Sequence, residues 1–362
     1  MSIVVFIDGL GFESAMAIGF DTFFDHARPL RPGIGYTVNI TTELFAGRRP
    51  DDAGFFNKWG RAPQRSPLRH WHGAGRVLAV LDRWPTADLA VRGALRRRGV
   101  DTARVPWRHC TTFGKIGHDV LFGPNRPAFL DGGVFLAHPR GLAGPDHDPG
   151  VLASAERAID AGLDVLTYLT YLDGIGHDTG PADVAYLERA CWYRDAIGRL
   201  MDRAAKRGGD ARIIVVSDHS MSPVTRHVRP PDAVFRRVAF VDSVMIRAWG
   251  RDAADVVGPL VDAGKGAVLD QADRDRFGVG RPDWGDVIFL LEPGGLFVPD
   301  YFTGIYRPAD QPALGMHGYH PDRDDTWGLF LSAGVRAPAG DPVDTMAAHA
   351  AIAALLGGDS GC

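Results

Sequence analysis

Three short apolar runs that each end near an aspartate constrain the fold of this 362-residue chain more than any other feature. These runs are Ile3–Ile7 before Asp8, Val165–Leu172 before Asp173, and Ile213–Val216 before Asp218. All-apolar runs of this length suit central strands that helices cover on both faces. In such sheets ligands bind beyond the carboxyl ends of the strands. The sequence therefore predicts three acidic side chains at the ligand-binding edge of one sheet.

Helix-like segments alternate with the apolar runs, which predicts an α/β fold with a mostly parallel central sheet. The expected helices, each followed by a glycine, are Thr86–Arg98, Pro181–Lys206 and Thr345–Leu356. Residues 229–312 break the alternation and are punctuated by Pro230-Pro231 and Pro293-Gly294-Gly295. We expect a catalytic core at 1–228 and 313–362 and an inserted cap subdomain at 229–312.

Composition excludes several classes of partner. The formal net charge is −4, which predicts neither a nucleic-acid polymer nor an anionic membrane as a partner. No apolar stretch reaches the roughly 18–20 residues of a membrane span. The N-terminus reads as a strand rather than a signal peptide, and three cysteines do not make a disulfide framework. A cytoplasmic setting is expected, and the oligomeric state stays open.

Histidines accompany the aspartates at the predicted strand ends. Asp173 and His177 stand four apart in a glycine-rich segment expected to be a loop, and His219 directly follows Asp218. His317 lies between two glycine-containing pairs just before another apolar run. Each piece alone has a structural explanation, such as a helix cap. Together they predict a metal centre, because carboxylate oxygen and imidazole nitrogen are ligands that Zn²⁺ accepts.

The order of these motifs resembles the type I phosphodiesterase/nucleotide pyrophosphatase family of the alkaline phosphatase superfamily. The stretch Tyr168–Pro181 is similar to the family's tyrosine, Asp-x-x-x-His and Gly-Pro signature. Val216–Met221 resembles its Ser-Asp-His-Gly-Met element, and Gly315–Tyr319 its Gly-x-His-Gly-Tyr element. The resemblance implies an alkaline-phosphatase-like three-layer sandwich with helices on both faces of the sheet.

The resemblance also implies a threonine nucleophile. The family threonine precedes a glycine by ten positions, and counting back from Gly47 gives Thr37. Thr41 and Thr42 then fall in the following helix, where they read as core or capping hydroxyls. Thr37 at a helix N-terminus suits this role, because free amides and the positive dipole end stabilise an alkoxide and a phosphoryl group.

Metal and substrate roles follow from the same resemblance. One metal ion is expected at Asp173, His177 and His317, and the other at Asp8, Asp218, His219 and the Thr37 oxygen. Both are expected to be Zn²⁺, with Mn²⁺ or Fe²⁺ as alternatives. Asn57 and the Val38 amide are expected to bind the phosphate oxygens. Tyr168 matches a tyrosine that packs on a nucleobase, whereas Val38 replaces the aromatic residue opposite it.

The implied activity is metal-dependent hydrolysis of a phosphodiester or nucleotide pyrophosphate bond through a phospho-threonine. The expected substrate is a small-molecule phosphate ester, with a nucleotide conjugate as one candidate. A phosphomonoesterase or phosphonate hydrolase on the same bimetal site is the alternative enzyme, and an inactive metal-binding scaffold is the alternative without catalysis. The sequence of the cap does not indicate which substrate the protein selects.

Overall fold

The computed structural model describes residues 1–71, 73–116, 120–123, 126–139, 147–208, 211–303, 308 and 310–357. The chain divides into two compact units. The first comprises Met1–Arg49, Asp119–Pro223 and Leu314–Cys362, and the second comprises Pro50–His118 and Val224–Ala313. We expected the core at 1–228 and 313–362 and the cap at 229–312. The second unit differs from the expected cap because it also contains the early segment Pro50–His118.

Packing inside the second unit explains that difference. Trp59 and Phe113 belong to the early segment, and Phe240 belongs to the later one. The Trp59 ring stacks on the Phe240 ring, and the Phe113 ring meets it edge-on. Arg247 donates a hydrogen bond to the carbonyl of Trp59. These contacts join residues far apart in sequence, so the alternation of apolar runs carried no sign of them.

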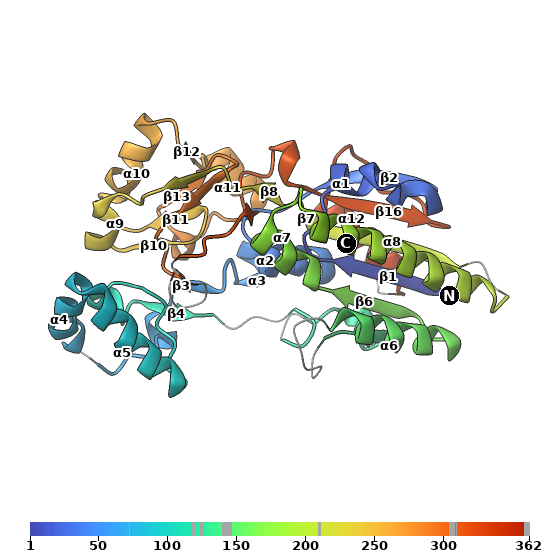
Figure 1. Cartoon of the computed structure of the whole chain (residues 1–362), viewed down its shortest axis with the longest axis horizontal. Helices are drawn as coiled ribbons and strands as arrows, with labels where there is room; N and C mark the ends of the chain where they lie inside the picture. Colours follow the sequence, from blue (N-terminus) through green and yellow to red (C-terminus); the bar gives the residue numbers. More distant parts are fainter. Residues whose placement is uncertain are drawn as a thin grey trace. The chain divides into compact units, whose positions relative to one another are not determined.

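The first unit contains the main sheet (Figure 1). Its strands are β1 (Ser2–Ile7), β2 (His26–Arg31), β5 (Phe135–Ala137), β6 (Val165–Leu169), β7 (Arg212–His219), β16 (Trp327–Ala333) and β17 (Val343–Asp344), with a separate pair of β8 (Ser222–Pro223) and β15 (Gly315–Met316). The strand order in the sheet is β17-β2-β16-β7-β1-β6-β5. Strand β16 is antiparallel to both of its neighbours, and the other pairs are parallel. The predicted α/β fold with a mostly parallel sheet is confirmed.

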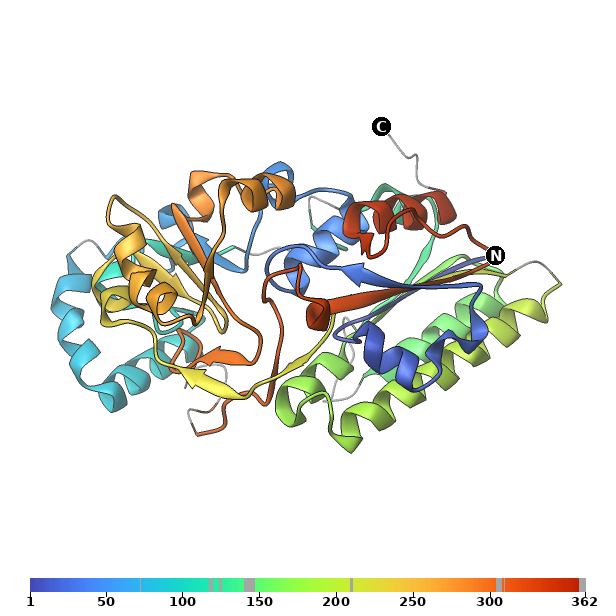
Figure 2. The same ribbon diagram turned by 90° about the horizontal axis from the view of Figure 1, so that it is seen from above.

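Helices cover both faces of this sheet. They are α1 (Phe12–Ala17), α2 (Thr37–Ala46), α6 (Asp148–Asp160), α7 (Tyr171–Thr179), α8 (Val184–Ala205) and α12 (Thr345–Leu355), with short 3₁₀ turns at Phe20–Phe23, Ala128–Leu130 and Asp324–Thr326. Figure 2 shows α12, in red, on the opposite side of the sheet from α6 and α8, in green. Alternate side chains of β1 divide accordingly: Ile3 and Val5 pack with α6 and α8, whereas Val4 and Phe6 pack with α2 and α12.

The second unit is built around a four-stranded antiparallel sheet of order β10-β11-β13-β12. Besides the four strands of this sheet, the second unit contains the pairs β14-β9 and β3-β4. The strands of the unit are β3 (Trp59–Arg61), β4 (Phe113–Lys115), β9 (Arg226–Val228), β10 (Ala239–Val241), β11 (Met245–Ala248), β12 (Gly266–Val268), β13 (Val287–Leu291) and β14 (Gly295–Phe297). Its helices are α3 (Pro50–Ala53), α4 (Ala74–Leu78), α5 (Pro85–Arg97), α9 (Asp232–Arg236), α10 (Ala253–Asp262) and α11 (Gln271–Phe277), with 3₁₀ turns at Pro63–Arg65, Ala79–Arg83, Trp107–His109 and Pro282–Trp284. Within the described residues, no helix has the length and apolarity that crossing a bilayer requires.

One local prediction was wrong. The glycine-rich segment after β6 forms the helix α7 rather than a loop. The helix packs closely against Met221 at Gly176. A Cβ atom at position 176 would lie 2.9 Å from Cε of Met221, which favours glycine there. The helical spacing sets Asp173 and His177 on one face, one turn apart.

Candidate metal centre

The parallel pairing of β1 with β6 and β7 brings the three predicted aspartates together. Asp8 directly follows β1, Asp173 lies in the first turn of α7, which follows β6, and Asp218 lies near the end of β7. Because parallel strands end at the same edge of a sheet, the three carboxylates meet there.

Asp8, Asp218 and His219 form one group of candidate ligands, whose ligand atoms all lie within 4.8 Å of one another. The Nε2 atom of His219 is 3.2 Å from Asp218 Oδ2 and 3.5 Å from Asp8 Oδ1. The Thr37 hydroxyl joins this group: its Oγ1 donates to Asp8 Oδ1 at 3.1 Å and lies 3.0 Å from His219 Nε2. These are the four residues expected at the second metal ion.

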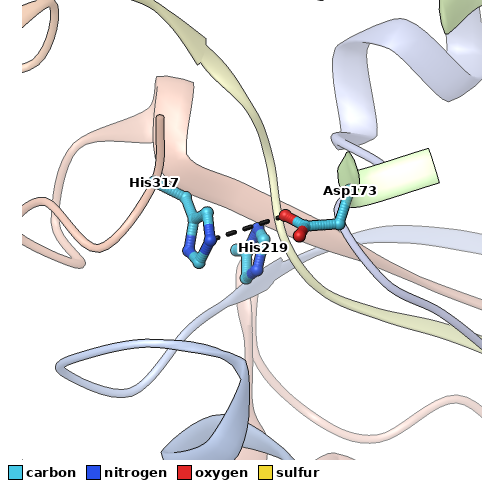
Figure 3. A group of neighbouring side chains, drawn as sticks. All are labelled: Asp173, His219 and His317. Carbon is cyan, nitrogen blue, oxygen red and sulfur yellow. Dashed lines mark ion pairs between the residues drawn. The ribbon is translucent and has the colours of Figure 1, made fainter. Parts of the chain in front are cut away.

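Asp173, His219 and His317 form another group of this kind (Figure 3). The Nε2 atoms of His177 and His317 lie 3.3 Å and 3.5 Å from Asp173 Oδ1. The three residues expected at the first ion thus converge on one carboxylate oxygen. His219 takes part in both groups, and its ring stacks on that of His317 with centroids 3.6 Å apart.

Backbone carbonyls orient two of the imidazoles. The Nδ1 atom of His177 lies 2.9 Å from the Gly315 carbonyl, and that of His219 lies 3.0 Å from the Ser220 carbonyl. A carbonyl only accepts, so Nδ1 carries the proton in both rings and Nε2 presents its lone pair. Metal-binding histidines are commonly held in this way.

The centre buries negative charge, and no lysine or arginine of the described residues forms an ion pair with its carboxylates. Asp8, Asp218 and His317 are buried. Burial, followed by the charges of Asp218 and Asp173, raises the pKa of Asp8 well above its usual value, and burial also raises the pKa of Asp218. Burial, followed by His219 and His177, lowers the pKa of His317.

Two buried carboxylate oxygens in the described part of the chain, Asp173 Oδ1 and Asp218 Oδ2, also lack a hydrogen-bond partner, as does Nδ1 of His317, whose Nε2 faces Asp173. Leaving such groups unpaired is costly, and divalent cations supply the missing partner. The donor set of carboxylates and imidazoles therefore fits two divalent ions.

Helix α2 begins at Thr37, as predicted. Tyr36 precedes the helix and gives it no side-chain cap. The hydroxyls of Thr41 and Thr42 bond back to the carbonyls of Thr37 and Val38. Those two threonines are thus internal to the helix, and Thr37 alone of the three directs its hydroxyl at the candidate ligands.

The expected substrate-binding residues have varied surroundings. Asn57 lies in the second unit, where its amide nitrogen donates to Asp242 at 2.7 Å and its oxygen accepts from the Lys58 amide. Tyr168 is half-buried, and its ring stacks on Phe6 with centroids 4.4 Å apart. That face of the ring is therefore occupied inside the core of the first unit, and the nucleobase contact stays a prediction.

Two further hydroxyl groups brace the centre, and no pattern in the sequence indicated them. Tyr186, from α8, donates to the Gly9 carbonyl at 2.6 Å, and Ser217 accepts from the Leu10 amide at 2.9 Å. Both hydroxyls are buried and look like ordinary core polar groups in the sequence. The backbone turns at Gly9, where φ is +80°, and a Cβ atom there would lie 3.1 Å from Asp173 Cα. Only glycine allows α7 to approach so closely.

Comparisons with known proteins agree with this fold. Residues 152–277 match the family model described as type I phosphodiesterase / nucleotide pyrophosphatase. No curated protein sequence matches the chain. Human ectonucleotide pyrophosphatase/phosphodiesterase 5 has a similar fold, with a TM-score of 0.66 and 14% identity, over 98% of this chain and 94% of that one. An inactive variant of the murine protein, solved in complex with AMP, gives a TM-score of 0.65 and 13% identity over 98% and 94% of the two chains.

The family match spans α8, Asp173, His177, Asp218 and His219. The fold comparison extends over the rest of the chain. The family is one of hydrolases of the phosphodiesterase and pyrophosphatase type. Together these findings identify residues 152–277 as similar to a type I phosphodiesterase/nucleotide pyrophosphatase domain and show that the whole chain shares the fold of these solved structures.

Proposed function

We propose that this hydrolase cleaves a phosphodiester or nucleotide pyrophosphate bond at two divalent metal ions, with Thr37 as the nucleophile. The observation that carries the proposal is the position of the Thr37 hydroxyl, within hydrogen-bond distance of two candidate ligands and at the start of a helix. A hydroxyl with only a structural role has no need of this combination.

The ligands would divide between two ions that share the edge of the sheet. Asp8, Asp218, His219 and Thr37 would hold one, and Asp173, His177 and His317 the other. Bound there, two divalent ions would offset the carboxylate charge and stabilise the entering and leaving oxygens of an in-line displacement. The absence of thiolates favours Zn²⁺, with Mn²⁺ and Fe²⁺ compatible with the same oxygen and nitrogen donors.

The chain's own groups then account for the covalent steps. Thr37 gives up its proton, which a bound ion would make more acidic, to a water molecule, and its oxygen attacks phosphorus. The bond to the leaving oxygen breaks, which yields a phospho-threonine and the departing alcohol or phosphate. A water molecule then attacks the same phosphorus and restores the Thr37 hydroxyl. The Val38 amide, at the N-terminus of α2, and the Asn57 amide are proposed to donate to the non-bridging oxygens.

The substrate is proposed to be a small-molecule phosphate ester, and a nucleotide conjugate is the first class to try. This rests on the match of residues 152–277 to the family model, and the AMP complex of the murine protein of similar fold is consistent with it.

Turnover of a bis-aryl phosphate and of a mono-aryl phosphate tests the proposal. We expect the wild-type protein to prefer the diester, Thr37→Ala to lose about three or more orders of magnitude in kcat, and Thr37→Ser to retain part of it. Acid-quenched wild-type protein should carry one phosphoryl group, and Thr37→Ala none. Faster monoester turnover, or an unchanged rate in Thr37→Ala, would overturn the assignment.

A further inference from the structure

The second unit contains a cavity of about 390 Å³ that the proposed chemistry does not use. Its walls come from α5 and the turns on either side of it, from the segment around α9, and from the chain after β14. Five arginines and three aspartates line it, which is an excess of two positive charges.

Internal donors satisfy the aspartates of this cavity. Asp88 accepts from Arg92 Nε and from Trp107 Nε1, both at 2.7 Å. Asp300 accepts from the Ser243 hydroxyl at 3.0 Å and from the amide of Thr303 at 2.7 Å. These carboxylates shape the cavity and have their charge and lone pairs engaged within the protein.

Arg92 is engaged in the same way. It is buried, and besides Asp88 it donates to the carbonyls of Ala103 and Val105 at 2.6 and 2.7 Å. Arg104 ties the two segments of the unit together, because its amide donates to the Tyr301 carbonyl at 2.6 Å. These two arginines line the cavity and are held in place by the protein itself.

The remaining arginines are exposed. Within the described residues, no ion pair involves Arg108 or Arg236. Arg229 lies 3.5 Å from Asp232, in a pair whose side chains are 79% and 67% exposed, and such pairs contribute little. Arg229 and Arg236 therefore carry charge that the protein itself leaves largely uncompensated, whereas the charge of Arg108 is offset in part by Asp82.

We propose that this cavity binds a small molecule that carries a phosphate group. Guanidinium groups recognise phosphate oxygens through paired hydrogen bonds, and a phosphate dianion matches the excess charge. The buried Tyr301, the half-buried Phe235 and the cavity's proline rings add an apolar wall for the organic part of the ligand. The volume suits a ligand of that size.

Calorimetric titration of the purified full-length protein with phenylphosphonate, which the proposed reaction cannot hydrolyse, tests this site. The paired substitution Arg108→Gln with Arg236→Gln should weaken one binding event by about tenfold or more. The control pair, Arg83→Gln with Arg251→Gln, removes the same charge from exposed arginines of the same unit that do not line the cavity, and should change the affinity by less than about twofold.

Inorganic phosphate serves as the second probe. If inorganic phosphate binds more weakly than phenylphosphonate, the apolar wall contributes to binding. If the two bind equally, the cavity recognises the anion alone, which contradicts that part of the proposal. Asp218→Asn should remove binding at the metal centre and leave this event intact, so failure of one proposal is separable from failure of the other. The site is rejected if the cavity pair leaves every binding event unchanged, or if both arginine pairs weaken binding equally.

Discussion

The buried carboxylates of the metal centre are a cost to the folded protein when no cation is present. Asp218 is fully buried, and its Oδ2 has no hydrogen-bond partner in the described part of the chain. Desolvation of such a group disfavours the charged form and the folded state that contains it. The same oxygen becomes favourable once a divalent ion binds it.

Asp218→Asn should therefore have opposite effects with and without metal. In chelator, we expect the variant to be more stable than the wild type by about 1–3 kcal/mol, because a buried charge is removed. With excess Zn²⁺ the order should reverse, because a ligand has been lost. Urea denaturation under both conditions measures this, and an unchanged order of stability would contradict the assigned role.

A second prediction at the residue scale concerns the pH dependence of stability that Glu43 causes. It is buried on α2, where Thr345 donates to it and Arg49 lies 3.7 Å away, and burial raises its pKa from 4.5 to about 7. Between these two values the native state binds more protons than the unfolded state, so this group makes stability fall as pH rises. The loss is complete above about pH 7 and amounts to about 3 kcal/mol.

Glu43→Gln should remove this contribution, so that its free energy of unfolding falls less than that of the wild type between pH 5 and 8. Denaturation across that range is the measurement. Glu13→Gln, at an exposed glutamate of α1, is the control and should follow the wild-type curve. Parallel curves for Glu43→Gln and the wild type would rule out the raised pKa.

Individual site residues were readable from the sequence because their chemistry depends on residue type and position along the chain. An aspartate that follows an apolar strand must lie at the carboxyl edge of the sheet, so Asp8, Asp173 and Asp218 could be placed together in advance. The surroundings of Tyr168 were not readable, because its stacking on Phe6 depends on the register of β1 against β6.

At the scale of elements, the close approach of α7 to the end of β1 sets the geometry of the centre. Gly9 permits it: its φ is +80°, and a Cβ atom would lie 3.1 Å from Asp173 Cα and 3.2 Å from Asp173 Cβ. Any side chain at this position would push the helix that carries Asp173 and His177 away from the sheet.

Gly9→Ala should thus lower both stability and metal affinity. Gly99 provides a matched control, since its φ is also +80° but nothing lies within 4 Å of its Cβ position. We expect Gly99→Ala to cost about 1 kcal/mol from backbone strain alone, and Gly9→Ala to cost more and to bind metal at least about tenfold more weakly. Equal effects of the two substitutions would show that the approach of α7 is not critical.

The sequence did not predict that the segment of α7 forms a helix. Gly174, Gly176 and Gly180 read as a loop because glycine disfavours helix interiors by roughly 1 kcal/mol each. Tertiary contacts override that preference: Gly176 packs against Met221, and the Gly315 carbonyl accepts from His177. The longer helices were predicted to within a few residues of their bounds, because their apolar periodicity is local.

At the scale of the whole molecule, the proposed ligands all belong to the first unit, whereas Asn57 belongs to the second. Metal removal should therefore act on the first unit. Hydrogen exchange in chelator is expected to speed up at the ends of β1 and β7 and in α7, because local opening there no longer breaks metal bonds. The four-stranded sheet of the second unit should keep its protection, and uniform loss across both units would contradict this account.

The extent of the second unit was the largest departure from the sequence-based division. Residues 229–312 were recognised because they interrupt the alternation of strands and helices. Pro50–His118 were not, because their membership rests on contacts such as Trp59 with Phe240, between positions far apart in the chain.

Anomalous X-ray scattering from crystals of the purified protein, at the absorption edge of its bound metal, tests the central claim most directly. We expect two peaks, one within bonding distance of Asp8, Asp218, His219 and the Thr37 hydroxyl, and one within bonding distance of Asp173, His177 and His317. Absence of peaks after incubation with Zn²⁺, Mn²⁺ and Fe²⁺, or peaks bound by other side chains, would contradict it.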